Sequence, residues 1–147
     1  MSSGAKHELR KRSEELNSRI REFGKTVQDI NRYFRNLGFG APVWHPEKVH
    51  SANLGGVDAD CYIGYSRIEG KWGLNIRIIE RDHETRAFVS QRVYSIETSG
   101  NMEIVVHALK KVPELMALLD TSIEQQVKTL ARAGTDFEEL RNLGREA

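Results

Sequence analysis

Apolar residues recur at helical spacing over the first 37 residues. From Leu16 onwards the spacing alternates between four and three residues, which is typical of a helix with one narrow apolar seam. Gly38 provides a stop signal, because glycine readily adopts the left-handed conformation that closes a helix. The pattern predicts a helix over residues 5–37, whose seam comprises Leu9, Leu16, Ile20, Phe23, Val27, Ile30, Phe34 and Leu37.

Helical spacing returns over residues 101–133. Pro113 predicts a kink, because proline lacks the N–H that the preceding turn requires. Thr121 and Glu124 have the spacing of a capping box, which predicts a second break near Asp120. The seam of this segment comprises Val105, Leu109, Val112, Met116, Leu119, Ile123, Val127 and Leu130.

The chain after this segment is predicted to form one more short helix. Gly134 is expected to end the long segment. Thr135 and Glu138 then repeat the capping-box spacing and predict a helix over residues 136–143.

The middle of the chain contains a loop followed by strands. Residues 38–57 are rich in glycine and proline and are predicted to be a loop, with a short strand near Val49 as an alternative and with Trp44 pinning the loop onto the core. Residues 58–96 are predicted to form an antiparallel meander with strands near 59–68, 71–81 and 86–96.

Turn positions set the register of this meander. Glu69-Gly70 is predicted to be a two-residue turn, which pairs residues whose numbers add up to 139, and a four-residue turn at 82–85 is predicted to follow. One face is then apolar, with Cys61, Ile63, Tyr65, Leu74, Ile76, Ile78, Ala87, Val89 and Val93. We expect Ile63, Leu74, Ile76, Ile78 and Val89 to be buried under Ile20, Phe23, Val27, Leu109 and Val112.

These elements predict an α+β fold in one domain of residues 1–147, with helices covering one sheet face. The length suits a single domain, and the net charge of +1 gives no general attraction to nucleic acid or membranes. Cys61 is the one cysteine, which excludes an internal disulfide. Without a long apolar stretch or a signal-peptide pattern, the chain is expected to be cytoplasmic and without a membrane partner.

Candidate chemistry is sparse. His45, His50, Asp58, Asp60 and Cys61 are close in sequence, but their spacing matches no metal-binding motif. We therefore predict no metal, no cofactor and no catalytic residue. A further alternative is a small metal-dependent hydrolase built on His45, His50, Asp58 and Asp60.

The polar face of the meander is a more informative surface. The predicted register brings Tyr62, Asn75, Arg77, Arg92 and Tyr94 together on it. Tyrosine and arginine are common at protein interfaces, and aromatic and arginine side chains on a sheet also bind single-stranded RNA. A solvated face without a ligand is the ordinary alternative.

We predict a non-enzymatic binding protein that acts through protein–protein contacts, as an adaptor, inhibitor or regulatory subunit. The alternative is a single-stranded nucleic-acid binder that uses the polar face. A helix over 5–37 would be about half as long again as the strands, so part of its seam should extend past the sheet. We therefore expect a homodimer formed through Leu16, Ile20, Phe23, Val27, Ile30 and Phe34.

Overall fold

The computed structural model describes residues 3–146 and confirms the α+β class. The outermost bounds of the predicted domain, residues 1 and 147, lie outside the described residues. The helices are α1 (Ser3–Arg35), the 3-10 helix η1 (Ile96–Thr98), α2 (Met102–Lys110), α3 (Val112–Asp136) and α4 (Glu138–Glu146). The strands are β1 (Val43–Trp44), β2 (His50–Asn53), β3 (Val57–Ile68), β4 (Lys71–Asp82) and β5 (Phe88–Ser95).

Within residues 3–146 the sheet has five strands, so the prediction of a loop over residues 38–57 is wrong in part. The order is β1-β3-β4-β5, and β2 also pairs with β3, so that β1 and β2 follow one another along the same edge. Backbone hydrogen bonds join His45 and Val49 to β3 as well. The glycine and proline residues separate two short pairing segments, which are too short to show an alternating pattern.

The predicted register of β3 and β4 is confirmed along its whole length. Tyr62 lies opposite Arg77 and Ile63 opposite Ile76, as the two-residue turn requires. Glu69 and Gly70 both have positive φ, at 50° and 81°. Such values match the twist of a tight hairpin.

The predicted register of β5 is wrong, and its two faces are exchanged. Arg77 lies opposite Val93, and Ile78 lies opposite Arg92. The cause is a longer connection after Asp82, in which Arg86 has a φ of 62° and the ladder shifts between Glu80 and Arg81. Ala87 therefore lies outside the strand, and Val89, predicted to be buried, is 51% exposed.

Of three boundaries predicted in the second helical segment, one is confirmed and two are wrong. The kink at Pro113 is confirmed as a break between α2 and α3, with proline in the first turn of α3. The predicted break near Asp120 is absent, because the Thr121 hydroxyl donates to the carbonyl of Ala117 within a continuous helix. Gly134 likewise lies inside α3 rather than at its end.

The core lies where the helices cross one end of the sheet. Ile63, Leu74 and Ile76 are fully buried, as predicted, and Ile78 is partly buried. The helices contribute the other side of this core with Val27, Phe34, Ile104, Val105, Ala108, Val112, Leu115 and Leu119. Ile20, predicted to belong to it, is 39% exposed, while Phe23 and Leu109 are partly buried at its margin.

A buried asparagine fixes α1 to the sheet edge. Asn31 is 1% exposed and lies on the same helix face as Val27 and Phe34. Its Oδ1 accepts a hydrogen bond from the backbone N–H of Leu74 at 2.8 Å, and its Nδ2 donates to Glu97 at 2.5 Å. Polar groups in a core require such partners, so Asn31 defines where the helix sits.

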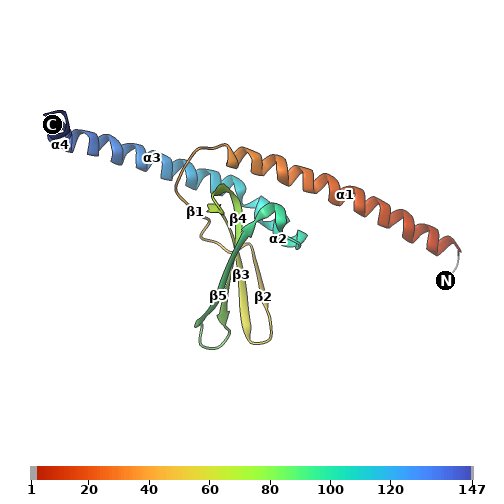
Figure 1. Cartoon of the computed structure of the whole chain (residues 1–147). Helices are drawn as coiled ribbons and strands as arrows, with labels where there is room; N and C mark the ends of the chain where they lie inside the picture. Colours follow the sequence, from red (N-terminus) through yellow and green to blue (C-terminus); the bar gives the residue numbers. More distant parts are fainter. Residues whose placement is uncertain (1–2, 147) are drawn as a thin grey trace.

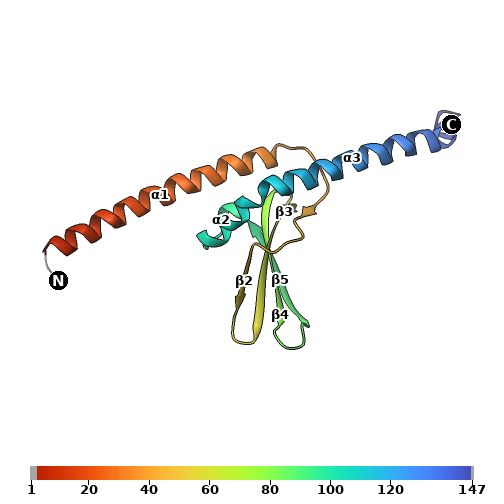
Figure 2. The same ribbon diagram turned by 180° about the vertical axis from the view of Figure 1, so that it is seen from behind.

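The two long helices leave this core in opposite directions. Figure 1 shows α1 beside the α2–α3 pair over the sheet, with the start of α1 extending to one side and the end of α3 to the other. The opposite view in Figure 2 agrees. The far end of the sheet, with the β2–β3 and β4–β5 turns, projects away from the helices.

The corrected register makes a direct prediction about stability. Ile76→Ala should reduce the free energy of unfolding by roughly 2–5 kcal/mol, because it leaves a cavity in a fully buried site. Val89→Ala should change it by less than about 0.5 kcal/mol, because that side chain is half exposed. Urea unfolding measures both changes, and equal losses for the two variants would contradict the placement of β5.

Candidate interaction surfaces

The sheet face opposite the helices, here called the outer face, carries part of the predicted binding surface. Tyr62, Asn75 and Arg77 lie on it. Arg92 and Tyr94 do not, because the register of β5 turns them to the helix side, where Tyr94 packs against the core. The prediction that these five residues share one face is therefore wrong for the two residues on β5.

Arg77 lies close to two aromatic rings on the outer face. Its guanidinium carbon lies 4.4 Å from the ring centre of Trp44 and 5.7 Å from that of Tyr62. The rings attract the cation through the negative potential of their faces. Burial of the guanidinium lowers the pKa of Arg77, and the charge of Tyr62 opposes this shift.

The hydrogen-bonding capacity of Arg77 is not used within residues 3–146. Its Nε is buried and has no partner among these residues, and no ion pair in this part of the chain involves the side chain. A guanidinium carries five N–H donors in a fixed fork that matches carboxylate and phosphate groups. The Arg77 stack, defined as Trp44, Tyr62 and Arg77, therefore offers an anion-binding donor beside two aromatic surfaces.

Gly64 makes room for this stack. It pairs directly with Trp44, and a Cβ atom at Gly64 would overlap the indole ring. Trp44 was predicted to pin the loop onto the core, but it lies on the outer face instead. Trp44 lies there because β1 pairs with β3 through Val43 and Trp44. Two residues show no alternating pattern, so the sequence could not predict this position.

Asn75 has a structural role on the same face. It is 3% exposed, and its Nδ2 donates to the backbone carbonyl and to the hydroxyl of Ser66 at 2.9 and 2.7 Å. With its amide hydrogens used inside the sheet, Asn75 supports the strands rather than offering a group to a ligand.

The residues of the hydrolase alternative do not converge on one site. Asp58 accepts hydrogen bonds from His83 and Arg86 near the projecting end of the sheet, and the His83 contact is the main cause of its lowered pKa. Asp60 accepts from Ser51 at 2.6 Å. Cys61 is buried, and loss of solvent raises the pKa of its thiol, so it is held in the neutral form.

His45 belongs to a separate polar cluster between β1 and α3. Ligand atoms of His45, Glu47 and Glu114 lie within 4.8 Å of one another, which is close enough for all three to contact one metal ion. The backbone N–H of Glu47 donates to Nδ1 of His45 at 3.0 Å, which places the ring proton on Nε2, 2.6 Å from Glu114. Lys111 lies 2.8 Å from Glu47 and 3.5 Å from Glu114.

The two carboxylates thus already have a histidine N–H and an ammonium group as partners. These contacts lower the pKa of Glu114, with the His45 hydrogen bond as the largest cause. The donor set fits a hydrogen-bonded clasp between the β1 loop and α3 better than a metal site.

The second surface consists of two helical arms. The α1 arm is residues 3–26, which precede Val27, the first buried residue of α1, and the α3–α4 arm is residues 120–146, which follow Leu119, the last buried residue of α3. Seam residues of both arms are 57–70% exposed: Leu9, Leu16, Val127, Leu130, Phe137, Leu140 and Leu143.

The predicted self-association seam is divided by this geometry. Leu16 and Ile20 are exposed on the α1 arm. Phe23 and Ile30 are partly buried against the core, and Val27 and Phe34 belong to it. The outer part of the seam is therefore the part that remains open to a partner.

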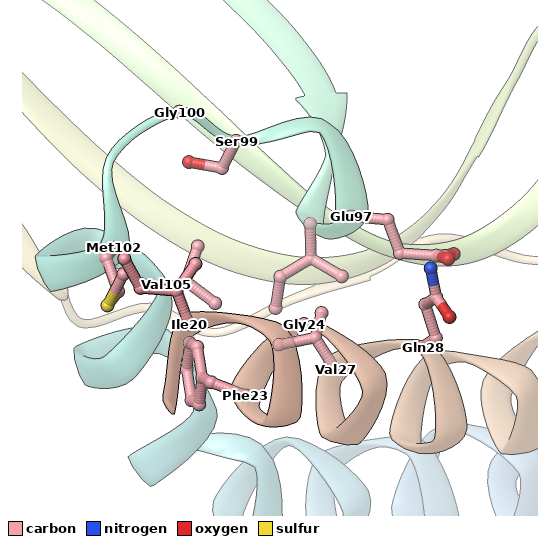
Figure 3. A pocket seen from close by; sticks show the side chains of 11 residues that line it. Ile20, Phe23, Gly24, Val27, Gln28, Glu97, Ser99, Gly100, Met102 and Val105 are labelled. Atoms are coloured by element: carbon pink, nitrogen blue, oxygen red, sulfur yellow. The ribbon is translucent and has the colours of Figure 1, made fainter. Parts of the chain in front are cut away.

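A hollow of about 240 Å³ joins the core to the α1 arm. Figure 3 shows Ile20 and Phe23 of α1 around this hollow, with Met102 and Val105 of α2 across from them. The apolar seam of α1 is therefore continuous from the buried Val27 to the exposed Leu16.

Substitution of Gly64 tests the outer-face geometry. Gly64→Ala should displace Trp44 and reduce the free energy of unfolding by about 1–3 kcal/mol, because the new methyl group overlaps the indole. Gly100→Ala is the matched control, since its Cβ would meet nothing within 4 Å. Urea unfolding and tryptophan fluorescence measure the two effects, and unchanged spectra and stability in Gly64→Ala would show that Trp44 lies elsewhere.

No protein-family model, curated protein or solved structure matches this chain. Among residues 3–146, none of the helices carries an apolar stretch long enough to cross a membrane. The Arg77 stack and the two helical arms are therefore the features from which a function is inferred.

Proposed function

We propose that this is a non-enzymatic binding protein that acts through protein–protein contacts and assembles as a homodimer through its helical arms. The observation that carries this proposal is the pair of exposed apolar seams that leave the core in opposite directions. An adaptor, inhibitor or regulatory subunit is the functional class that such surfaces fit.

The arms need a covering surface for physical reasons. Exposed leucine, isoleucine and phenylalanine in a continuous row favour aggregation unless a partner covers them. An isolated helix gains little stability from its own hydrogen bonds, and in proteins most helical stability comes from packing of the apolar face. A second copy of the chain supplies matching seams and is present wherever the protein is made.

The arms cannot cover each other within one chain. The part of α1 that precedes Ile20 extends beyond α2 on one side of the core, and the part of the chain that follows Ile123 extends beyond the end of α1 on the other. A contact between the two arms would require α1 to leave the core contacts of Val27 and Phe34 and the hydrogen bonds of Asn31. Association between chains keeps all of these contacts.

The mass in solution tests this proposal. Size exclusion with light scattering at micromolar concentration should give twice the 16.8 kDa mass of one chain. Leu16→Glu should shift the population to monomer, because it places a charge in the seam. Ser18→Glu adds the same charge two residues away and should remain dimeric.

A monomer mass for the wild-type chain at every concentration up to the millimolar range would contradict self-association. Equal effects of Leu16→Glu and Ser18→Glu would show that the seam is not the contact. Circular dichroism of each variant separates a change in association from a loss of helix.

The Arg77 stack favours a second candidate function, the binding of single-stranded nucleic acid. Aromatic rings stack on bases of any sequence, and an arginine with free donors binds phosphate. The stack has Trp44 and Tyr62 in the first role and Arg77 in the second.

Fluorescence anisotropy with a labelled oligothymidylate tests this candidate. Tyr62→Leu should weaken binding by roughly 5- to 150-fold, the equivalent of about 1–3 kcal/mol for one stacked base. Arg77→Gln should weaken binding and reduce its salt dependence, because one phosphate contact is lost. Arg67→Gln, which removes an exposed arginine of β3 on the other sheet face, opposite Trp72, is the control. Wild-type protein that leaves the anisotropy unchanged would exclude this function.

A further inference from the structure

We propose that in the dimer the α1 arm of each protomer packs antiparallel against the α3–α4 arm of its partner. This inference rests on the self-association proposed above and adds which surfaces meet. One two-fold axis then covers all four arms.

Closure of the assembly favours this unlike pairing. If two α1 arms paired with each other, the α3–α4 arms would point away from the contact and stay exposed, because the arms leave each core in opposite directions. If the α3–α4 arms then also paired with each other, each would bind a third copy, and the result would be an open chain of molecules. Unlike pairing around a two-fold axis is closed at two copies.

The half turn between Figure 1 and Figure 2 shows that a two-fold rotation across the helices exchanges the sides of the two arms. It moves the α1 arm to the side that the α3–α4 arm occupied before the turn. A two-fold axis that crosses the helices therefore places the α1 arm of one copy on the same side as the α3–α4 arm of the other, at both ends of the pair. Because α1 runs towards its core and α3 runs away from its own, the paired helices are antiparallel.

The lengths of the arms are compatible with this pairing. At 1.5 Å per residue, residues 3–26 span about 36 Å and residues 120–136 span about 25 Å. The α1 arm can thus cover the α3 part of the partner's arm and reach its turn into α4.

The net charges of the two arms are opposite. Residues 3–26 contain seven Lys or Arg and four Asp or Glu, a net charge of +3. Residues 120–146 contain four Lys or Arg and six Asp or Glu, a net charge of −2. Like pairing would place arms of the same sign together, whereas unlike pairing places opposite signs together.

The residues next to the seams sharpen this difference. Arg10 follows Leu9 in the sequence, Arg12 lies one helical turn before Leu16, and Arg19 directly precedes Ile20. Next to the other seam, Glu124 follows Ile123, and Glu138 follows Phe137. Charges at such flanking positions determine partner choice and orientation in paired helices.

The present partners of these side chains do not oppose the pairing. Arg19 lies 3.7 Å from Glu15, and Glu124 lies 3.1 Å from Lys128. Glu138 lies 3.9 Å from Arg141, and all three are exposed pairs about one turn apart on a helix. Exposed pairs of this kind contribute little and exchange readily with new partners.

Charge reversal and rescue in the full-length chain test the pairing. Arg10→Glu, Arg12→Glu and Arg19→Glu together should weaken the dimer on the order of tenfold, because the flanking charges of the two arms then repel. Adding Glu124→Arg and Glu138→Arg to the same chain should restore affinity. The matched control reverses three charges on the far side of the α1 arm, with Lys11→Glu, Arg21→Glu and Lys25→Glu, and should leave the dimer unchanged. Analytical ultracentrifugation gives the dissociation constants, and circular dichroism verifies the helix content.

The outcomes separate this inference from the proposal on which it rests. A wild-type monomer would overturn self-association itself and the pairing with it. A wild-type dimer that the three arginine reversals leave unchanged or tighten would overturn unlike pairing and indicate contact between two α1 arms. A weakened dimer that the two glutamate reversals fail to rescue would also overturn it.

Discussion

The buried amide of Asn31 is the contact on which the position of α1 depends. It accepts from the backbone N–H of Leu74, at the part of the β4 edge that β5 leaves unpaired, and donates to Glu97, which also forms an ion pair with Arg35. A buried N–H without an acceptor costs about 1–3 kcal/mol, so sliding or rotating the helix is unfavourable. Because Asn31 lies near the end of α1, most of the helix necessarily extends beyond the sheet.

The same constraint gives the molecule its asymmetry of packing. Core side chains are concentrated under Val27 and Phe34 of α1 and under Val112 to Leu119 of the α2–α3 pair, while both arms have exposed seams. The break at Pro113 keeps α2 and α3 on one side of the sheet and directs α3 away from the α1 arm. Each long helix buries apolar side chains along one short stretch and exposes them along the rest of its seam. Association with a second copy would bury these exposed side chains.

Local signals in the sequence were sufficient for the long helices and the three long strands, but not for the short strands β1 and β2 or for the faces of β5. The turn at Glu69-Gly70 allows one register, and the β3–β4 pairing agrees with it. The connection after Asp82 allows several, because backbone N–H groups of Glu84 and Thr85 bind the Asp82 carboxylate, lower its pKa and hold a longer turn than the spacing suggests. Trp44 lies on the outer face because β1 pairs with β3, but β1 has only two paired residues, which is too few to show a periodic pattern in the sequence. Asn31 lies in line with Val27 and Phe34, so it could be detected as a polar residue on an apolar helix face.

Hydrogen exchange as a function of protein concentration tests the central claim most directly, because it reports on the arms themselves. Backbone amides of residues 3–26 and 120–146 should exchange more slowly at high protein concentration than at low concentration, as the arms become covered. Amides of β3 and β4 should exchange at the same rate in both samples, since their core lies within one chain. Exchange in the arms that is fast and independent of concentration would contradict the account.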